Sequence, residues 1–172
     1  VGLRKDHYRN IIEERPKFSF LEVHPENYFA FGPEVKLLEI AAQYYPISLH
    51  AVGLSLGSAQ RVSINHLTLL KKLVDKINPV FVSDHASWSM SGNAHLNDLL
   101  PLPYTKESLN KLCDNVKLTQ DFLGRQILVE NPSTYIQFKG EYKEYEFMNM
   151  VTHMTGAGLL LDVNNIYVSS KN

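Results

Sequence analysis

Histidines and carboxylates recur in this sequence at the ends of short apolar runs. His50 ends "PISLH", His85 ends "PVFVSDH", Glu130 ends "QILVE" and Asp162 ends "GLLLD". Imidazole and carboxylate groups are the ligands that borderline and hard divalent cations take in proteins. A single histidine at such a place is more often a hydrogen-bonded core or capping group. Four such groups in comparable positions, however, predict a metal site.

The stretch "LLLDVNNIYVS", from Leu159 to Ser169, supplies one more candidate ligand. A carboxylate and two amides at the end of an apolar strand are costly to bury without a partner. In an extended chain, Asp162 and Asn164 point to one side while Asn165 points to the other. We therefore expect Asp162, with Asn164 as a further ligand, to face the cation.

Other polar residues near these strand ends are expected to assist the site. Asp84 adjoins His85 and points to the opposite side of an extended chain, which suits a group that orients the histidine. Asn131, which precedes a proline, either supports the site or opens the next loop. In "LEVHPEN" a proline interrupts the alternation of side chains between the two sides of the strand. The sequence therefore leaves open whether Glu22, His24 and Glu26 support the site, contact the substrate or bind the metal.

These side chains can converge only if the strands that carry them run in the same direction. Apolar runs rich in Val, Ile, Leu and Phe alternate with helical patterns along the chain, and such runs are typical of parallel strands buried on both faces. The runs are "FSFLEV", "PISLHAV", "PVFVSDH", "QILVEN" and "GLLLDV", with "VGL" as a candidate first strand. The alternation predicts an α/β fold with about six β/α units of a (β/α)8 TIM barrel, truncated at its C-terminal end, or else an open sheet.

Four helices are expected between the strands, at residues 33–45, 63–77, 105–124 and 142–156. Pro33 suits a helix start, Thr105 suits an N-cap, and Gly124 and Gly156 suit the positions after helix ends. The longest irregular segment, 86–104, is expected to be a loop. Because loops that follow strands form the active face of such barrels, it either covers the site or is a plain connection.

Composition narrows the class of protein. With 172 residues, 44% hydrophobic and 20% charged, we expect one globular domain over 1–172. Seventeen Lys and Arg against eighteen Asp and Glu are scattered along the chain, which argues against nucleic-acid or membrane surfaces. The single cysteine excludes an intramolecular disulfide and favours a cytoplasmic location. The missing initiator Met, and an end just past the sixth strand, lead us to expect part of a longer gene product.

Seven segments together resemble the multinuclear non-haem iron-dependent oxidative enzymes, a bacterial family that includes the oxidases of methanobactin and thiaglutamate biosynthesis. They follow one another over nearly the whole chain: "VGLRKDHY", "LEVHPENYF", "YPISLHAVGLSLGS", "VSDHASW", "DLLPLPYT", "LGRQILVENPSTY" and "GLLLDVNNIYVS". The resemblance implies a xylose-isomerase-like TIM barrel that uses two or three irons and O2 to modify cysteine in ribosomally made peptides, usually with a partner protein that presents the peptide. It also implies iron ligation by His50, His85, Glu130 and Asp162, with Asn164 as an additional ligand, and further ligands from later strands.

The sequence thus predicts an iron- and O2-dependent oxidoreductase acting on a peptidyl cysteine, with His85 and Glu130 as catalytic residues. One ferrous iron would bind the substrate thiolate, and Glu130 would bridge two irons through its two oxygens. A Zn- or Mn-dependent hydrolase or sugar isomerase on the same barrel is one alternative, since the same ligands accept several divalent ions. A non-catalytic barrel fragment that only binds a partner is the other, and it would hold no stoichiometric metal.

Overall fold

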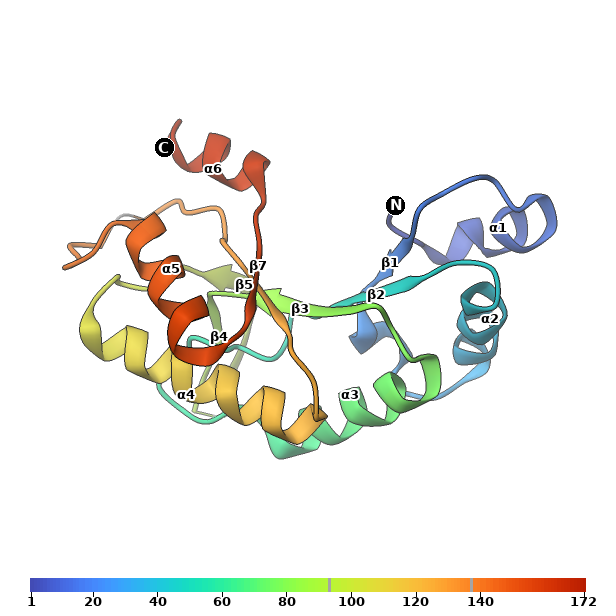
Figure 1. Ribbon diagram of the computed structural model, residues 1–172, viewed down its shortest axis with the longest axis horizontal. Coiled ribbons are helices and arrows are strands. Elements are labelled where there is room, and N and C mark those ends of the chain that lie inside the picture. The colour runs from blue at the N-terminus through green and yellow to red at the C-terminus, as the bar shows by residue number, and fades with distance from the viewer. Residues whose placement is uncertain (93, 137) are drawn as a thin grey trace.

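A sheet of five parallel strands forms the centre of the molecule (Figure 1). The computed structural model describes residues 1–92, 94–136 and 138–172. The strands lie side by side in chain order: β1 (Leu21–Val23), β2 (Ile47–His50), β3 (Phe81–His85), β6 (Leu128–Glu130) and β7 (Gly158–Leu160). The N-terminal "VGL" forms no strand, but Gly2 makes an isolated parallel bridge to Glu22 and marks a sixth position. Parallel neighbours in chain order are the arrangement of successive units in a β/α barrel.

The four predicted helices are confirmed, with ends shifted by at most three residues. They are α2 (Pro33–Ala42), α3 (Ile64–Ile77), α4 (Lys106–Leu123) and α5 (Glu144–Thr155). The Thr105 side chain accepts from the backbone N–H of Ser108, and Gly124 and Gly156 take left-handed conformations with φ of 68° and 70°. Because a glycine has no Cβ, it adopts this conformation without strain. In the described part of the chain, no helix has the length and apolar character needed to cross a membrane.

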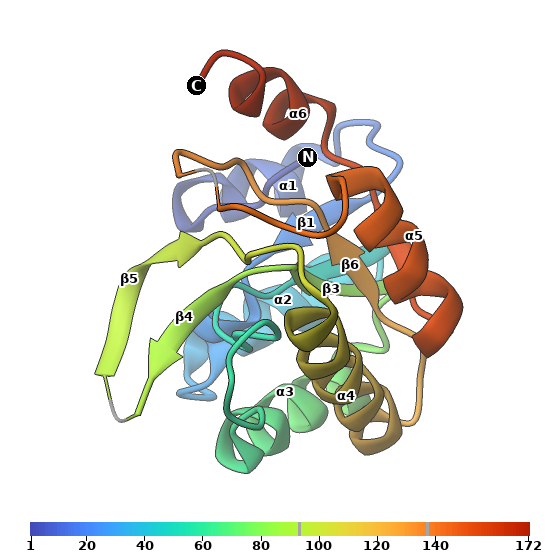
Figure 2. The same ribbon diagram turned by 90° about the vertical axis from the view of Figure 1, so that its left-hand side faces the viewer.

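Short helical segments that were not predicted flank the strands. They are η1 (Lys5–His7), α1 (Tyr8–Glu14), η2 (Pro25–Tyr28) and α6 (Val163–Ser169). Figures 1 and 2 show α6 on the opposite side of the sheet from α3 and α4. The strand β7 ends at Leu160, and Asp162 is the N-cap of α6, its side chain accepting from the backbone N–H of Asn165. The expected extended conformation of this stretch was therefore wrong, because the cap starts a helix at Val163.

The central sheet has a different chemistry on its two faces. Alternate strand residues are apolar and buried: Leu21, Val23, Ile47, Leu49, Val82 and Val129. The residues between them are mostly polar: Glu22, Ser48, His50, Ser83, His85 and Glu130. Because successive side chains point to opposite faces of a strand, the first set packs under the helices while the second shares the other face. Burial on both faces was expected, but Phe81 and Leu159 are 48% and 44% exposed.

The segment expected to be a loop contains a two-stranded antiparallel sheet. Its strands are β4 (Trp88–Ser91) and β5 (Ala94–Leu100), and Figure 2 shows this hairpin standing apart from the central sheet. The indole N–H of Trp88 donates to the carbonyl of Pro101 over 3.0 Å, which ties the hairpin's first strand to the chain that leaves it. The prediction failed because Asn, Asp and Gly are depleted in strands, and they recur in this stretch.

One buried amide on α4 holds the loop that follows β2. Asn115, which is 3% exposed, donates to the carbonyls of Leu56, Ser58 and Gln60, and its side-chain oxygen accepts from the N–H of Val62. These contacts satisfy backbone groups that would otherwise be buried without partners.

Replacing Asn115 with Ala should therefore lower the free energy of unfolding by about 3 kcal/mol, because several buried backbone groups lose their partner. Urea unfolding followed by circular dichroism measures the change. Asn110→Ala, an exposed position on the same helix, is the matched control and should change stability by less than about 0.5 kcal/mol. Equal stability of the two variants would contradict the role given to the amide.

Candidate metal site

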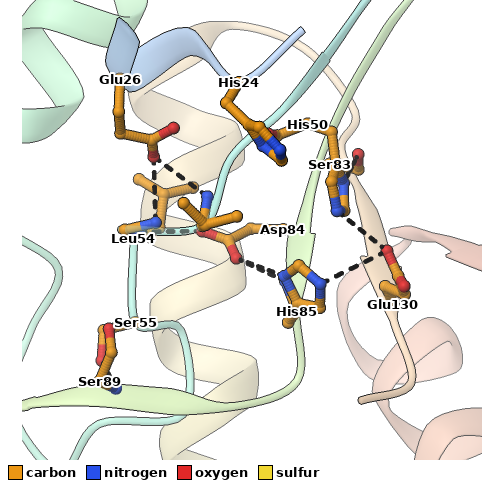
Figure 3. Close-up of polar contacts among 12 residues, drawn as sticks. His24, Glu26, His50, Leu54, Ser55, Ser83, Asp84, His85, Ser89 and Glu130 are labelled. Atoms are coloured by element: carbon orange, nitrogen blue, oxygen red, sulfur yellow. Dashed lines mark hydrogen bonds and ion pairs between the residues drawn. The ribbon is translucent and has the colours of Figure 1, made fainter. Parts of the chain in front are cut away.

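Two imidazoles and one carboxylate converge at the ends of three neighbouring strands (Figure 3). His50, His85 and Glu130 end β2, β3 and β6, and one ligand atom of each lies within 4.8 Å of the others. Glu130 Oε2 is 3.2 Å from His50 Nε2 and 3.7 Å from His85 Nε2. All three side chains are buried. The parallel register that pairs His85 with Glu130 brings these strand ends together.

The other nitrogen of each imidazole is held by a neighbour. His50 Nδ1 lies 2.7 Å from the hydroxyl oxygen of Ser83, and His85 Nδ1 lies 3.2 Å from Asp84 Oδ1. Asp84 is 1% exposed, and its second oxygen accepts from the backbone N–H of Leu54 over 2.9 Å. An acceptor at Nδ1 keeps the proton there and leaves the Nε2 lone pair free for a cation, as in carboxylate–histidine–metal arrangements. Asp84 therefore lies where an orienting group is expected, and Ser83 is a supporting residue that sequence reasoning missed.

Burial and neighbouring charges shift the pKa of all three groups. Burial raises the pKa of Glu130 to about 7, and the nearby carboxylates of Asp162 and Glu22 contribute in the same direction, while His85 opposes them. Burial lowers the pKa of His85, but the hydrogen bond and charge of Asp84 outweigh it, so the pKa is raised overall. Burial, followed by the charge of His85, lowers the pKa of His50. A cation between these groups would relieve the cost of the ionised carboxylate.

The structure places Asp162 beside this cluster and Asn164 away from it. Asp162 is half-buried near Glu130, whereas Asn164 is exposed on α6. The expectation that Asp162 and Asn164 point to one side was wrong, because the chain turns into a helix between them. Instead, Asn165 donates from Nδ2 to Glu130 Oε1 over 3.1 Å. The signal that could have found it is the spacing of an N-cap aspartate and a residue three positions later.

The remaining candidates surround the cluster at different distances. His24 Nδ1 lies 2.9 Å from the carbonyl oxygen of His50, and Glu22 accepts a 3.4 Å hydrogen bond from the Ser48 hydroxyl. Glu26 lies outside the cluster: its carboxylate accepts from the N–H groups of Val52 and Gly53 at 3.1 and 3.0 Å. Figure 3 shows Glu26 apart from the two imidazoles and Glu130. Glu26 thus stabilises the loop that follows β2.

A cavity of about 340 Å³ adjoins the cluster. His85, Glu130, Asp162 and Asn165 line one part of it. The rest is lined by β5 and by the loop after β6, through Asp98, Leu99, Pro132, Ser133 and Tyr135. The sequence left open whether the segment between β3 and α4 covers the site or only connects two elements. Because Asp98 and Leu99 belong to this segment, it forms part of the cavity wall. The three residues could hold a cation, and the cavity lies directly beside two of them, His85 and Glu130.

Comparison with known proteins identifies the family. A family model described as "RiPP precursor modification enzyme MbnB/TglH/ChrH" matches residues 1–172. The chain belongs to this family.

Curated relatives of this MbnB/TglH/ChrH chain carry the name UPF0276 protein. Those from Psychromonas ingrahamii, Vibrio parahaemolyticus and Chromobacterium violaceum are 48%, 51% and 46% identical over the whole chain. The chain spans 61%, 60% and 63% of these relatives' lengths.

Two solved structures share the fold. The match to SacUVDE has a TM-score of 0.61 at 17% identity and covers 94% of this chain and 57% of SacUVDE. The match to endonuclease IV from Thermus thermophilus has a TM-score of 0.59 at 14% identity and covers 98% of this chain and 62% of the endonuclease. With the parallel strands in chain order, this likeness places the chain among xylose-isomerase-like TIM barrels, as part of one barrel.

In metal-free protein, Glu130→Gln should raise the free energy of unfolding at pH 8 relative to wild type. The folded-state pKa of about 7 lies above the ordinary 4.5, so ionisation of Glu130 costs stability as pH rises between these values. We expect Glu130→Gln to raise the free energy of unfolding by on the order of 1 kcal/mol at pH 8 and by little at pH 4. The gain is smaller than the full pKa shift would give, because water reaches part of the cavity. Urea unfolding in the presence of a chelator measures it. Glu141→Gln, at an exposed position, should show no such pH dependence, and a pH-independent effect of Glu130→Gln would contradict the assignment.

Proposed function

We propose that the full-length protein is an iron- and O2-dependent oxidoreductase that modifies cysteine in a ribosomally synthesised precursor peptide. The observation that carries this proposal is the donor set of two imidazoles and one carboxylate at the barrel's strand ends, in a chain of the MbnB/TglH/ChrH family. Two histidines and one carboxylate with open positions are typical of non-haem Fe(II) oxygenases. As part of the same proposal, the protein acts in the cytoplasm and a partner protein presents the peptide.

In this proposal His50, His85 and Glu130 hold the first iron. Asp162 and Glu22, whose charges raise the pKa of Glu130, are the carboxylates that the proposal assigns to a second or third ion. An iron centre supplies O2 activation and a site for the substrate thiolate. Ser83 and Asp84 keep the two imidazole rings oriented, and the pKa of Glu130 near 7 suits a carboxyl that releases its proton when a cation binds.

The cavity supports a peptide substrate. Its wall combines an aromatic ring, Tyr135, and an aliphatic side chain, Leu99, with polar groups close to the cluster. Exposed apolar residues continue on the same loop and hairpin, at Ile136, Phe138 and Leu96. Most of the cavity lining is polar, so the proposal assigns these apolar side chains to contacts with the body of the peptide and the polar groups to its reacting end.

A metal-dependent hydrolase is the second candidate. Zinc also accepts two histidines and one carboxylate, and the fold resembles that of an endonuclease. Against a nucleic-acid substrate stands the formal charge of -1 with no basic segment, because phosphate backbones are bound by clustered Lys and Arg. Metal identity separates the two candidates.

Full-length protein produced with iron and purified without oxygen should contain more than one iron per chain. His85→Ala and Glu130→Ala should each lose iron and reduce O2-dependent turnover of a cysteine-containing precursor peptide by at least about 100-fold. Glu141→Ala should retain both. Stoichiometric zinc or manganese without oxidase activity would favour the hydrolase, and full activity of His85→Ala would refute the proposed site.

Asp84→Asn should weaken metal binding by about 10- to 100-fold while leaving the fold intact. The amide can still accept from Leu54 through its oxygen, but its NH2 group then faces both the backbone N–H and the Nδ1–H of His85 and no longer orients the ring. Competition with a chromophoric chelator measures the affinity. Asp121→Asn, at an exposed position of α4, is the control, and an unchanged affinity for Asp84→Asn would show that His85 needs no such support.

A further inference from the structure

The side chain of Asn131 continues the β6–β7 ladder beyond its last backbone pair. That pair is Glu130 with Leu160. One step further, Asn131 Oδ1 accepts from the backbone N–H of Asp162 over 2.8 Å, and Asn131 Nδ2 donates to the carbonyl of Asp162 over 3.1 Å. One amide thus takes both main-chain polar groups of Asp162. Asn131 is 2% exposed, so a loss of these contacts would leave a buried amide without partners.

This contact holds the residue directly before α6. Asp162 is held in an extended conformation, with φ of −90° and ψ of 106°, and its Oδ1 accepts from the backbone N–H of Asn165 over 2.9 Å. The helix therefore starts directly after the residue that Asn131 holds. Asn165 is the third residue of α6, and the third residue of a helix lies close to the N-cap. Asn165 therefore lies near the end of β6.

Asn165 closes the connection to the metal site. Its Nδ2 donates both to Glu130 Oε1, over 3.1 Å, and to the carbonyl of Asn131, over 2.9 Å. Because both neighbouring atoms are acceptors, the nitrogen of the Asn165 amide, and not its oxygen, must face them. Glu130 consequently has one oxygen in contact with Asn165, while its other oxygen, Oε2, faces the Nε2 atoms of His50 and His85.

We propose that Asn165 is a positioning residue that sets the orientation of the Glu130 carboxylate, so that Oε2 is the oxygen presented together with the two imidazoles. This inference rests on the proposed metal-binding function. The physical reason is that a glutamate side chain has three rotatable bonds, and a hydrogen bond from an amide to a carboxylate oxygen restricts the last of them. Groups that hydrogen-bond to metal ligands in this way typically contribute about 10- to 100-fold in affinity.

The chain offers a matched control for the test. Asn110 is an exposed amide on α4 that does not line the cavity beside the metal site. Full-length, metal-free wild type, Asn110→Ala and Asn165→Ala would be titrated without oxygen with Co²⁺, whose visible absorption reports its coordination. We expect Asn165→Ala to bind Co²⁺ about 10- to 100-fold more weakly with an altered spectrum, and Asn110→Ala to match wild type. A wild-type affinity and spectrum for Asn165→Ala would overturn the inference.

A second measurement separates failure of this inference from failure of the proposed function. Crystal structures of metal-free wild type and Asn165→Ala would show the Glu130 side chain directly. A rotated or disordered Glu130 in Asn165→Ala supports the positioning role, and an unchanged Glu130 overturns it, whether or not Co²⁺ binds. Wild type that binds neither Co²⁺ nor iron would refute the proposed function. Thermal unfolding of the same variants shows whether a lost affinity is caused by loss of the fold.

Discussion

The burial of one carboxylate between two imidazoles is the constraint on which the rest of this structure depends. Glu130 is 5% exposed, its pKa is raised to about 7, and its Oε2 faces two nitrogen atoms. Such an arrangement is costly in an apolar core, and it persists only where surrounding groups hold every member in place. Ser83, Asp84 and Asn165 each contact one of the three side chains.

The division of the sheet into an apolar and a polar face makes this arrangement compatible with folding. The apolar side chains under the helices supply the hydrophobic stabilisation, so the opposite face is free to carry His50, His85 and Glu130. The loop after β2 is in turn tied to its surroundings by carboxylates and an amide. Glu26 and Asp84 accept from its backbone N–H groups, and Asn115 contacts its carbonyls. The supports of the site and of the fold are thus partly the same residues.

Membership of the MbnB/TglH/ChrH family and the geometry of the cluster point in the same direction. The family is one of enzymes that modify RiPP precursors, and the cluster of two imidazoles and one carboxylate is a donor set that divalent metal ions take. The likeness to SacUVDE and endonuclease IV concerns the fold alone, since the identities are only 17% and 14%. Because the chain spans 61% and 60% of two curated relatives, the iron count, the substrate and the partner are proposals about the whole protein.

Sequence by itself determined the alternation of strands and helices, three helix caps or ends, and the convergence of His50, His85 and Glu130. Each depends on local periodicity, together with the rule that parallel strands end at one edge. Tertiary structure decided which atoms Asn165 meets, because its contacts with Glu130 and Asn131 join it to residues 35 and 34 positions away in the chain. It also decided the hairpin of β4 and β5, whose polar residues do not favour strands. Short-range patterns identify which residues carry the chemistry, whereas contacts between distant segments determine which atoms face one another.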